Sequence, residues 1–196
     1  EIMDKIILAS KSKVRKEILN SNDINCEVVP SNIDEESIKV SLIKEKATPE
    51  TISKTLAELK ANKVSVKFKN KLVIGADSVI DFEGNIISKP RDRSIALDIL
   101  KLLNNKSHYL ISSVCISRDG NMIWNYTEKA KLTMKQFALH ELEDYLSKIN
   151  DETLYAYNVY QIEGIGKNLF SKIEGDEDTI MGLPIKKIKE YLNNYN

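Results

Sequence analysis

The sequence predicts an α/β fold with a mixed β-sheet, and three observations support this class. Short apolar runs alternate with segments of helical period in the first half of the chain. Two long strand-like segments then follow each other around an Asp119-Gly120 turn, which is typical of a hairpin. With 196 residues the chain can bury one sizeable core, so we expect one compact unit, either a single domain or two closely packed lobes.

The first elements are predicted to be a strand, a turn and a helix. Residues 5–9 form a short apolar run, and apolar residues then recur at helical spacing from Val14 to Leu19. A later apolar segment, residues 71–81, has the period of a buried strand and contains Asp77 in its middle. Asp77 is therefore expected beside a sheet rather than on a loop.

A helix is also predicted between these two strands. Thr48 and Pro49 have the residue types of an N-cap and a first helical position. Ile52, Leu56 and Leu59 follow as an apolar stripe at helical spacing.

The second half continues with hairpins and further helices. In chain order we expect a turn at residues 83–85 before a short strand, a helix at 95–103 capped by Ser94, strands at 108–117 and 122–134, a helix at 139–149, a strand at 168–175 and a final helix from Pro184.

Charge and cysteine usage exclude several classes of function. Lys plus Arg equal Asp plus Glu at 29 each, so no overall field gathers nucleic acid or membrane lipid, and a small-molecule partner is expected. Cys26 and Cys115 lack the spacing of zinc ligands, and buried free thiols are expected in a reducing cytosol. Because no apolar run approaches the roughly 20 residues of a membrane span and no signal peptide is recognisable, we expect a cytoplasmic protein.

The stretch "IILASKSKVRKEIL" passes abruptly from apolar to basic residues. Ser10, Ser12, Lys13 and Arg15 stand where a strand gives way to a helix, and the N-terminus of a helix is a natural site for a phosphate. Serines at such a position are more commonly helix caps. The stretch alone leaves both interpretations open.

Asp77 and an acidic run at residues 34–36 are the candidate metal ligands. A carboxylate within an apolar strand is seldom buried unless it is paired or bound to a metal, although a solvent-facing Asp at a bulge is an equal alternative. The acidic run is typical of a solvated loop, yet a carboxylate from it beside Asp77 would suit a hard cation such as Mg²⁺.

Two lysines complete the set of candidates. Lys60 lies at the edge of the apolar stripe of its helix, and Lys89 precedes Pro90 where a strand ends. Each alone is typical of a surface lysine. Together, carboxylates, lysines and a helix N-terminus are the groups needed for metal-assisted attack on a phosphoanhydride. The glycine patterns of the dinucleotide fold and of the P-loop are both missing, and His108 and His140 are interpreted as structural or surface residues.

The segments "LASKSKVRKEIL", "GADSVI", "SKPRD", "YQIEG" and "MGLP", in that order, resemble the Maf family of nucleotide pyrophosphatases. The resemblance runs nearly end to end and implies a single Maf-like domain over residues 1–196. It implies a twisted mixed sheet flanked by helices, with two lobes and a central cleft, similar to the inosine triphosphate pyrophosphatases. The implied activity is hydrolysis of nucleoside triphosphates between the α and β phosphates, giving a monophosphate and pyrophosphate.

The resemblance also implies roles for individual residues. Ser10, Ser12 and Arg15 match the phosphate-binding segment of the family. Its catalytic positions are matched by Asp77 in "GADSVI", Glu35 in "NIDE", Lys60 in "LAELKA" and Lys89 in "SKPRD". Asp77 would activate water, directly or through Mg²⁺ or Mn²⁺ held with Glu35, while the two lysines and Arg15 would stabilise charge on the phosphates.

The chain departs from many members of the family in the segment "YAYNVYQIEG", where those members have "DKAGAYGIQG". Glu163 replaces a glutamine, and "EGIGKNLFSKIEG" together with Val14 before the arginine resembles a subfamily that includes enzymes preferring 7-methyl-GTP. A carboxylate only accepts hydrogen bonds, and guanine offers N1–H and N2–H₂ donors, so Glu163 is a candidate base-reading residue.

Three alternatives stay open at this stage. The substrate could instead be dTTP or UTP, as in the members with "DKAG". The missing Asp-Lys pair would also fit a nucleotide-binding regulator of cell division with little catalysis. A nucleotidyltransferase is disfavoured because Lys11 and Lys13 stand where such enzymes need a glycine-rich turn. A homodimer is expected as a common arrangement.

Overall fold

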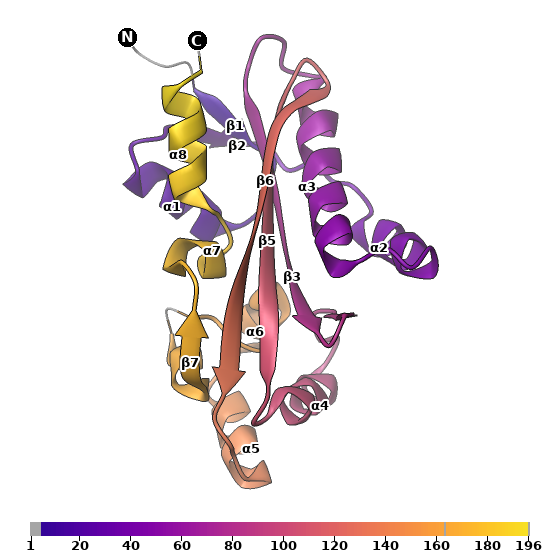
Figure 1. Cartoon of the computed structure of the whole chain (residues 1–196), viewed down its shortest axis with the longest axis vertical. Helices are drawn as coiled ribbons and strands as arrows, with labels where there is room; N and C mark the ends of the chain where they lie inside the picture. Colours follow the sequence, from indigo (N-terminus) through magenta and orange to yellow (C-terminus); the bar gives the residue numbers. More distant parts are fainter. Residues whose placement is uncertain (1–4, 163, 196) are drawn as a thin grey trace. The chain divides into compact units, whose positions relative to one another are not determined.

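The computed structural model describes residues 5–162 and 164–195. The strands are β1 (Ile6–Leu8), β2 (Cys26–Val28), β3 (Val73–Phe82), β4 (Asn85–Ile87), β5 (Ser107–Arg118), β6 (Asn121–Met134) and β7 (Phe170–Glu174) (Figure 1). The helices are α1 (Lys13–Ser21), α2 (Glu35–Lys44), α3 (Pro49–Ser65), α4 (Arg93–Leu103), α5 (Leu139–Ser147), α6 (Asp151–Tyr157), α7 (Glu177–Met181), α8 (Ile185–Asn193) and the 3-10 helix η1 (Ile165–Leu169).

Within the described residues the strands form a seven-stranded sheet in the order β2-β1-β3-β5-β6-β7, with β4 paired to β3. The pairs of β1 with β2 and β3 are parallel, whereas β3 with β4 and β6 with β7 are antiparallel. The predicted α/β class with a mixed sheet flanked by helices is therefore confirmed.

The chain divides into two units. Unit 1 contains residues 5–78, 111–129 and 176–195, and unit 2 contains residues 79–110, 130–162 and 164–175. The long strands β3, β5 and β6 contribute residues to both units.

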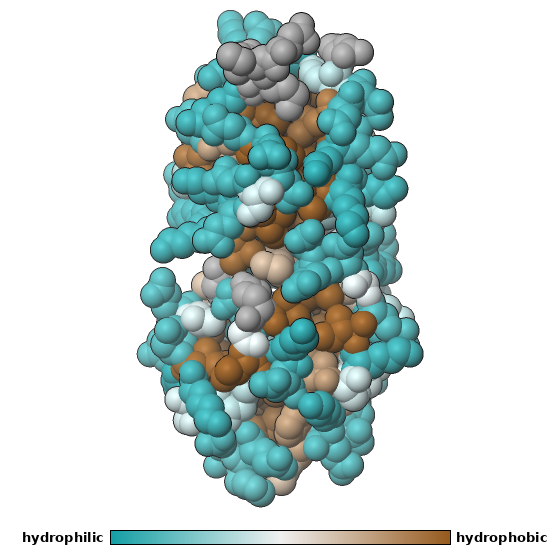
Figure 2. Space-filling view, turned by 90° about the vertical axis from the view of Figure 1, so that its left-hand side faces the viewer, coloured by the Kyte–Doolittle hydropathy of each residue, from teal (hydrophilic) through white to brown (hydrophobic). Residues whose placement is uncertain are grey.

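In unit 1, helices lie on both sides of the strands. Figure 1 shows α2 and α3 on one side of β5 and β6, and α1 and α8 on the other. One apolar cluster joins β1 and β3 to α3 through Ile7, Ala9, Val64 and Val73, all of them buried. Figure 2 shows mainly hydrophilic side chains over α1 and α8, with hydrophobic ones between them, as expected of amphipathic helices on a sheet.

The helix starts of unit 1 follow the capping rules. Thr48 caps α3, its side chain accepting from the Thr51 N–H group, and Pro49 occupies the first turn, as predicted. The acidic run at residues 34–36 is not a loop, and that expectation was wrong. Asp34 caps α2, and the next two glutamates occupy its first turn, where the partial positive charge of the helix favours them.

The predicted apolar stripe of α3 was wrong at one position. Leu59 is 38% exposed, whereas Ile52 and Leu56 are buried as expected, and Lys60 is buried with them. Residues four apart share one face of a helix, so Lys60 follows Leu56 into the interior. The polar end of Lys60 must therefore find partners inside the protein.

Unit 2 consists of hairpins with short helices. The turn before β4 is formed by Glu83 and Gly84, both with positive φ, as the predicted hairpin requires. Helix α4 begins at Arg93 with Asp92 as its N-cap, so the expectation of Ser94 as the cap was wrong by two residues. No helix in the described part of the chain is long and apolar enough to cross a membrane.

Candidate active site

The turn between β1 and α1 supplies two serines and an arginine. Ser12 is the N-cap of α1, and its Oγ accepts a hydrogen bond from the Arg15 backbone N–H at 3.3 Å. Ser10 is buried, and its Oγ accepts from the Ser12 backbone N–H at 3.3 Å. A helix N-terminus that follows a strand in this way suits a bound phosphate, and Ser12 also serves as the cap. Val14, in the first turn of α1, is buried in the core.

Arg15 is held by residues that are distant in sequence. Its Nε donates to the Gly182 carbonyl oxygen at 2.9 Å, its Nη1 to Ser10 Oγ at 3.1 Å and its Nη2 to Ser78 Oγ at 3.3 Å. Gly182 has φ +120°, and a Cβ there would lie 3.3 Å from Arg15 Nε. The glycine therefore provides both the backbone conformation and the space that this contact needs.

The close approach of α3 to β3 brings Lys60 to Asp77. Gly75 on β3 faces α3, and a Cβ at this position would overlap the Ala57 carbonyl oxygen and lie 2.8 Å from the Ala61 backbone nitrogen. Ala57 and Ala61 are themselves fully buried small residues. These three small residues allow the backbones of α3 and β3 to approach each other closely. The side chain of Lys60 can therefore reach Asp77, two residues after Gly75 on β3.

Lys60 Nζ binds two carboxylates and a carbonyl group. It lies 2.6 Å from Glu35 Oε1 and 3.3 Å from Asp77 Oδ1, and it donates to the Ala76 carbonyl oxygen at 3.1 Å. The side chains of Lys60 and Asp77 are 8% and 10% exposed, while that of Glu35 is 41% exposed. The cluster thus runs from the interior to the surface, and Glu35, at the start of α2, forms its exposed end.

Asp77 has an unusual electrostatic environment. Burial raises the pKa of its carboxyl group above the ordinary value, Lys60 and Arg15 oppose this shift, and Glu35 adds to it. Asp77 Oδ1 accepts from Lys60, but Oδ2 is buried and no donor among the described residues reaches it. A buried carboxylate oxygen with unused lone pairs can accept a proton or bind a cation.

Buried hydroxyl groups fix the backbone beside Asp77. Ser53 Oγ, from α3, donates to the Asp77 carbonyl oxygen at 3.1 Å and lies 2.9 Å from Ser113 Oγ on β5. Ser113 Oγ in turn lies 2.9 Å from Thr127 Oγ1 on β6. Helix α3 therefore holds Asp77 both by its carboxylate, through Lys60, and by its backbone, through Ser53.

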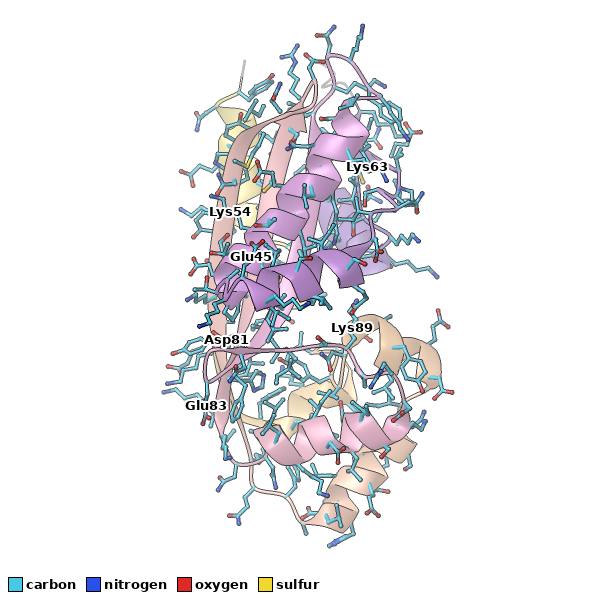
Figure 3. All side chains as sticks on the ribbon, turned by 90° about the vertical axis from the view of Figure 1, so that its right-hand side faces the viewer. Glu45, Lys54, Lys63, Asp81, Glu83 and Lys89 are labelled. Carbon is cyan, nitrogen blue, oxygen red and sulfur yellow. The ribbon has the colours of Figure 1, made fainter. Side chains whose placement is uncertain are left out.

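Most of the predicted site residues meet in unit 1. Glu35, Lys60 and Asp77 form one ionic cluster, and Ser10, Ser12 and Arg15 form the adjacent turn, with Arg15 close enough to lower the pKa of Asp77. Lys89 belongs to unit 2 and is exposed on the segment between β4 and α4 (Figure 3). Glu163 lies outside the described residues.

Sequence reasoning missed several residues that support the site. These are Ser53, Gly75, Ser78, Ser112 and Gly182. A signal for Ser112 was present in "LISSVCIS", where two adjacent serines interrupt an apolar strand. A buried hydroxyl needs a partner, so such a pair indicates a polar contact on each face of the sheet. Gly75 and Gly182 lie in the quoted segments "GADSVI" and "MGLP", but no local pattern indicated the close contacts that they make.

The carboxylates fit a two-ligand metal site better than a protein cage. No group of three or more His, Cys, Asp or Glu side chains is placed to hold a metal ion within residues 5–162 and 164–195. Glu35 and Asp77 nevertheless share Lys60, and the unused Asp77 Oδ2 is a hard oxygen ligand. Mg²⁺ commonly takes one or two carboxylates and completes its shell with water and substrate phosphates, so this donor set suits it.

Comparison with known proteins identifies the family. The family model described as "Maf-like protein" matches residues 5–195. The chain belongs to the Maf-like protein family. This Maf-like chain is 70% identical, over 97% of its length and 98% of the relative's, to a protein of Pelagibacter ubique named nucleoside triphosphate pyrophosphatase. It is 36% identical, over 92% and 91% of the two chains, to a protein of Rhizobium etli named 7-methyl-GTP pyrophosphatase.

Solved structures support the predicted fold of this Maf-like chain. The Ham1 protein of Staphylococcus aureus has a TM-score of 0.50 at 14% identity and covers 97% of this chain and 99% of its own. A HAM1 protein from Coxiella burnetii has a TM-score of 0.54 at 11% identity, with 98% and 100% covered. At these identities the likeness concerns the fold alone, and it supports the predicted mixed sheet flanked by helices.

Proposed function

We propose that the chain hydrolyses nucleoside triphosphates between the α and β phosphates, releasing a nucleoside monophosphate and pyrophosphate. The observation that carries this proposal is the buried Lys60–Asp77 pair, joined to Glu35 and beside the Arg15 turn. The name of the Pelagibacter ubique relative, at 70% identity, agrees with it. The proposed enzyme is thus a hydrolase acting on phosphoanhydrides.

Asp77 has the properties of the general base in this reaction. Its Oδ2, which no donor among the described residues reaches, would activate the attacking water either by taking its proton directly or, with that oxygen on a metal ion, through metal-bound water. The raised pKa of the carboxyl group makes it a better proton acceptor than an ordinary aspartate. Lys60 opposes this rise and so favours the ionised carboxylate that a general base needs.

The cationic groups are proposed to bind and stabilise the triphosphate. Phosphate oxygens would accept hydrogen bonds from Arg15 and from the N-terminus of α1, and also from the hydroxyl groups of Ser10 and Ser12. Lys60 and Lys89 would stabilise the negative charge that grows on the leaving pyrophosphate. As Lys60 already touches both carboxylates, its first role is to hold Asp77 and Glu35 in place.

Glu35 and Asp77 are the residues that would hold Mg²⁺ or Mn²⁺. Such a cation neutralises phosphate charge and lowers the pKa of bound water. Removal of divalent cations with EDTA should abolish pyrophosphate release, and excess Mg²⁺ or Mn²⁺ should restore it. Full activity in EDTA would overturn the metal requirement while leaving the hydrolase proposal intact.

The proposed base specificity rests on the name of one relative and on one residue, Glu163. The relative from Rhizobium etli suggests 7-methyl-GTP, and Glu163 is the proposed reader of guanine N–H donors. The alternative substrates are dTTP and UTP. If Glu163 reads the base, Glu163→Gln should shift preference from guanine toward pyrimidine triphosphates, and an unchanged ranking would remove this role.

The decisive experiment is a substrate panel. Pyrophosphate release should be measured with 7-methyl-GTP, GTP, UTP, dTTP and CTP, each with Mg²⁺ and Mn²⁺. The proposal expects turnover of at least one triphosphate, with one monophosphate formed per pyrophosphate. Release of orthophosphate instead would contradict cleavage between the α and β phosphates. Tight binding of a triphosphate without turnover under either metal would favour the regulator of cell division.

Three further expectations stay predictions. They are a single Maf-like domain of two closely packed lobes with a cleft between them, a cytoplasmic location and a homodimer. Sedimentation equilibrium of the full chain tests the last of these, since a dimer should have twice the 22.3 kDa mass of the chain.

A further inference from the structure

A chain of hydroxyl groups connects Arg15 to α7 through two strands. Arg15 Nη2 donates to Ser78 Oγ on β3 at 3.3 Å, and Ser78 Oγ lies 3.0 Å from Ser112 Oγ on β5. Ser112 Oγ donates to the Thr179 carbonyl oxygen at 2.7 Å. All these residues belong to unit 1, so the relay Arg15–Ser78–Ser112–Thr179 is internal to that unit.

The ends of this relay fix the direction of every hydrogen bond in it. A guanidinium group can only donate, and a carbonyl oxygen can only accept. Ser112 uses its single hydroxyl proton for Thr179, so it must accept from Ser78. Ser78 then uses its own proton for Ser112 and accepts from Arg15. One arrangement satisfies all the groups, and rotating any hydroxyl would leave an unsatisfied polar atom.

Burial makes this arrangement costly to break. Ser112 and Thr179 are both 0% exposed. The Thr179 hydroxyl also donates to the Glu128 carboxylate on β6, which ties α7 to the sheet. The loop after α7 supplies the Gly182 carbonyl oxygen that accepts from Arg15 Nε. Helix α7 therefore restrains Arg15 from two sides, through Gly182 directly and through Thr179 by way of the serines.

Strand geometry separates this relay from the carboxylate cluster. Asp77 and Ser78 are neighbours on β3, and Ser112 and Ser113 are neighbours on β5, so their side chains alternate between the two faces of the sheet. Asp77 and Ser113 face α3, whereas Ser78 and Ser112 face α1 and α7. The hydroxyl relay is thus an independent support for Arg15 and makes no contact with Lys60.

We propose that Ser78, Ser112 and Thr179 are positioning residues for Arg15, which they hold in the orientation that directs its guanidinium group to the substrate phosphates. This inference rests on the proposed triphosphate hydrolysis. The relay would act on the transition state, because phosphate charge grows there and a misdirected guanidinium group would lose most of its effect.

The first test compares buried serines of one strand. Ser112→Ala should lower kcat about tenfold and weaken triphosphate binding less, by about three- to fivefold, since Arg15 contacts the phosphates in the ground state and more strongly in the transition state. Ser117→Ala is the control, because Ser117 is also buried on β5 but donates to Asn62 Oδ1 at 2.6 Å. A similar loss in both variants would identify a general packing effect and overturn the proposal.

Thr179 offers a conservative pair. Thr179→Ser keeps the hydroxyl donor to Glu128 and should retain kcat within about twofold, whereas Thr179→Val has nearly the same shape without the donor and should lower kcat by about three- to tenfold. Equal activity of the valine and serine variants would show that the Thr179 hydroxyl does not position Arg15.

A double-mutant cycle with Arg15→Ala decides whether the relay acts through Arg15. If it does, Ser112→Ala should cause no further loss of kcat once Arg15 is gone, while an independent structural effect would multiply with that of Arg15→Ala. The same cycle should be measured on the binding of an α,β-methylene triphosphate by calorimetry. Multiplicative effects in both measurements would overturn the inference.

Failure of this inference can be distinguished from failure of the proposed function. If wild-type protein releases pyrophosphate but the cycle is multiplicative, the relay is wrong and the activity stands. If wild-type protein binds the analogue without turnover, the proposed activity fails, and coupling in the binding cycle supports the relay. If the protein neither binds nor turns over a triphosphate, both proposals are wrong.

Discussion

Asp77 in unit 1 and His108 in unit 2 are both buried polar side chains, and each has one atom that no donor or acceptor among the described residues reaches. Their surroundings differ. Lys60, Arg15 and Glu35 all act on the pKa of Asp77. His108 bonds Tyr160 OH through Nε2 at 2.8 Å, and it packs against the rings of Tyr160 and Phe170.

The pKa shifts of Asp77 and His108 have different causes. Desolvation raises the pKa of Asp77, but the neighbouring cations favour its charged form, so the two influences compete. Burial alone lowers the pKa of His108 to about 4, and no charged neighbour contributes. At neutral pH the imidazole is therefore uncharged, and no charged group among the described residues acts on its pKa. An unsatisfied buried atom indicates a reactive group only where charges surround it.

Among the substitutions that test this difference between Asp77 and His108, loss of Lys60 should have the largest effect on activity. Lys60→Met removes the cation that holds both carboxylates, and kcat/KM should fall about a hundredfold. Because Lys60 lowers the pKa of Asp77, the acidic limb of the pH profile should also move to higher pH in the variant. Lys54→Met, at an exposed position of α3 (Figure 3), is the control and should leave both quantities unchanged. An unshifted acidic limb in Lys60→Met would contradict this account of Asp77.

Gly75→Ala should damage the same cluster through packing. The added methyl group would overlap the Ala57 carbonyl oxygen and push α3 away from β3, which should lower the free energy of unfolding by about 1–3 kcal/mol. Urea denaturation measures this change. Gly164→Ala is the control, because a Cβ there would meet the Gln161 carbonyl oxygen at an ordinary 3.7 Å. Equal stability of the two variants would refute the close approach.

His108→Gln should have the smallest effect on activity, with kcat/KM within about twofold of wild type because the residue is structural. The free energy of unfolding of His108→Gln should depend less on pH than that of the wild-type protein. The folded pKa of His108, about 4, lies below the unfolded value of 6.5, so the unfolded state binds more protons between these values and wild-type stability falls as pH drops through that window. Urea unfolding at pH 7 and pH 5 measures this loss of stability. If the variant lost as much stability as the wild-type protein between these pH values, His108 would be excluded as the cause.

Much of the fold was predictable because its signals are local. The hairpin turns at Glu83-Gly84 and Asp119-Gly120 and the Thr48-Pro49 helix start are set by a few adjacent residues. The short elements β2, α6 and α7 were missed because three to seven residues carry too little periodicity to register. The start of α2 was mistaken for a loop because acidic residues suit both a solvated loop and the first turn of a helix.

The site was predictable in its charged members and in the two serines of the Arg15 turn. A family resemblance pointed to Glu35, Lys60 and Asp77, and the structure brings the three together. Without the resemblance, Lys60 was expected at the surface, because a lysine in a helix is normally exposed. The supporting hydroxyls and glycines depend on contacts between residues far apart in the chain, such as Arg15 with Gly182, and no local pattern encodes those.

The central claim is that Asp77 supplies the base for pyrophosphate release, and a comparison of two aspartates on β3 tests it most directly. Asp81 lies four residues along the same strand, and its Oδ1 accepts from the Gly84 backbone N–H at 2.9 Å within the β3-β4 turn. Asp77→Asn should lower kcat by about 10²- to 10⁴-fold while the protein stays folded by circular dichroism. Asp81→Asn should stay within about threefold of wild type. Pyrophosphate release by folded Asp77→Asn at the wild-type rate would contradict the claim.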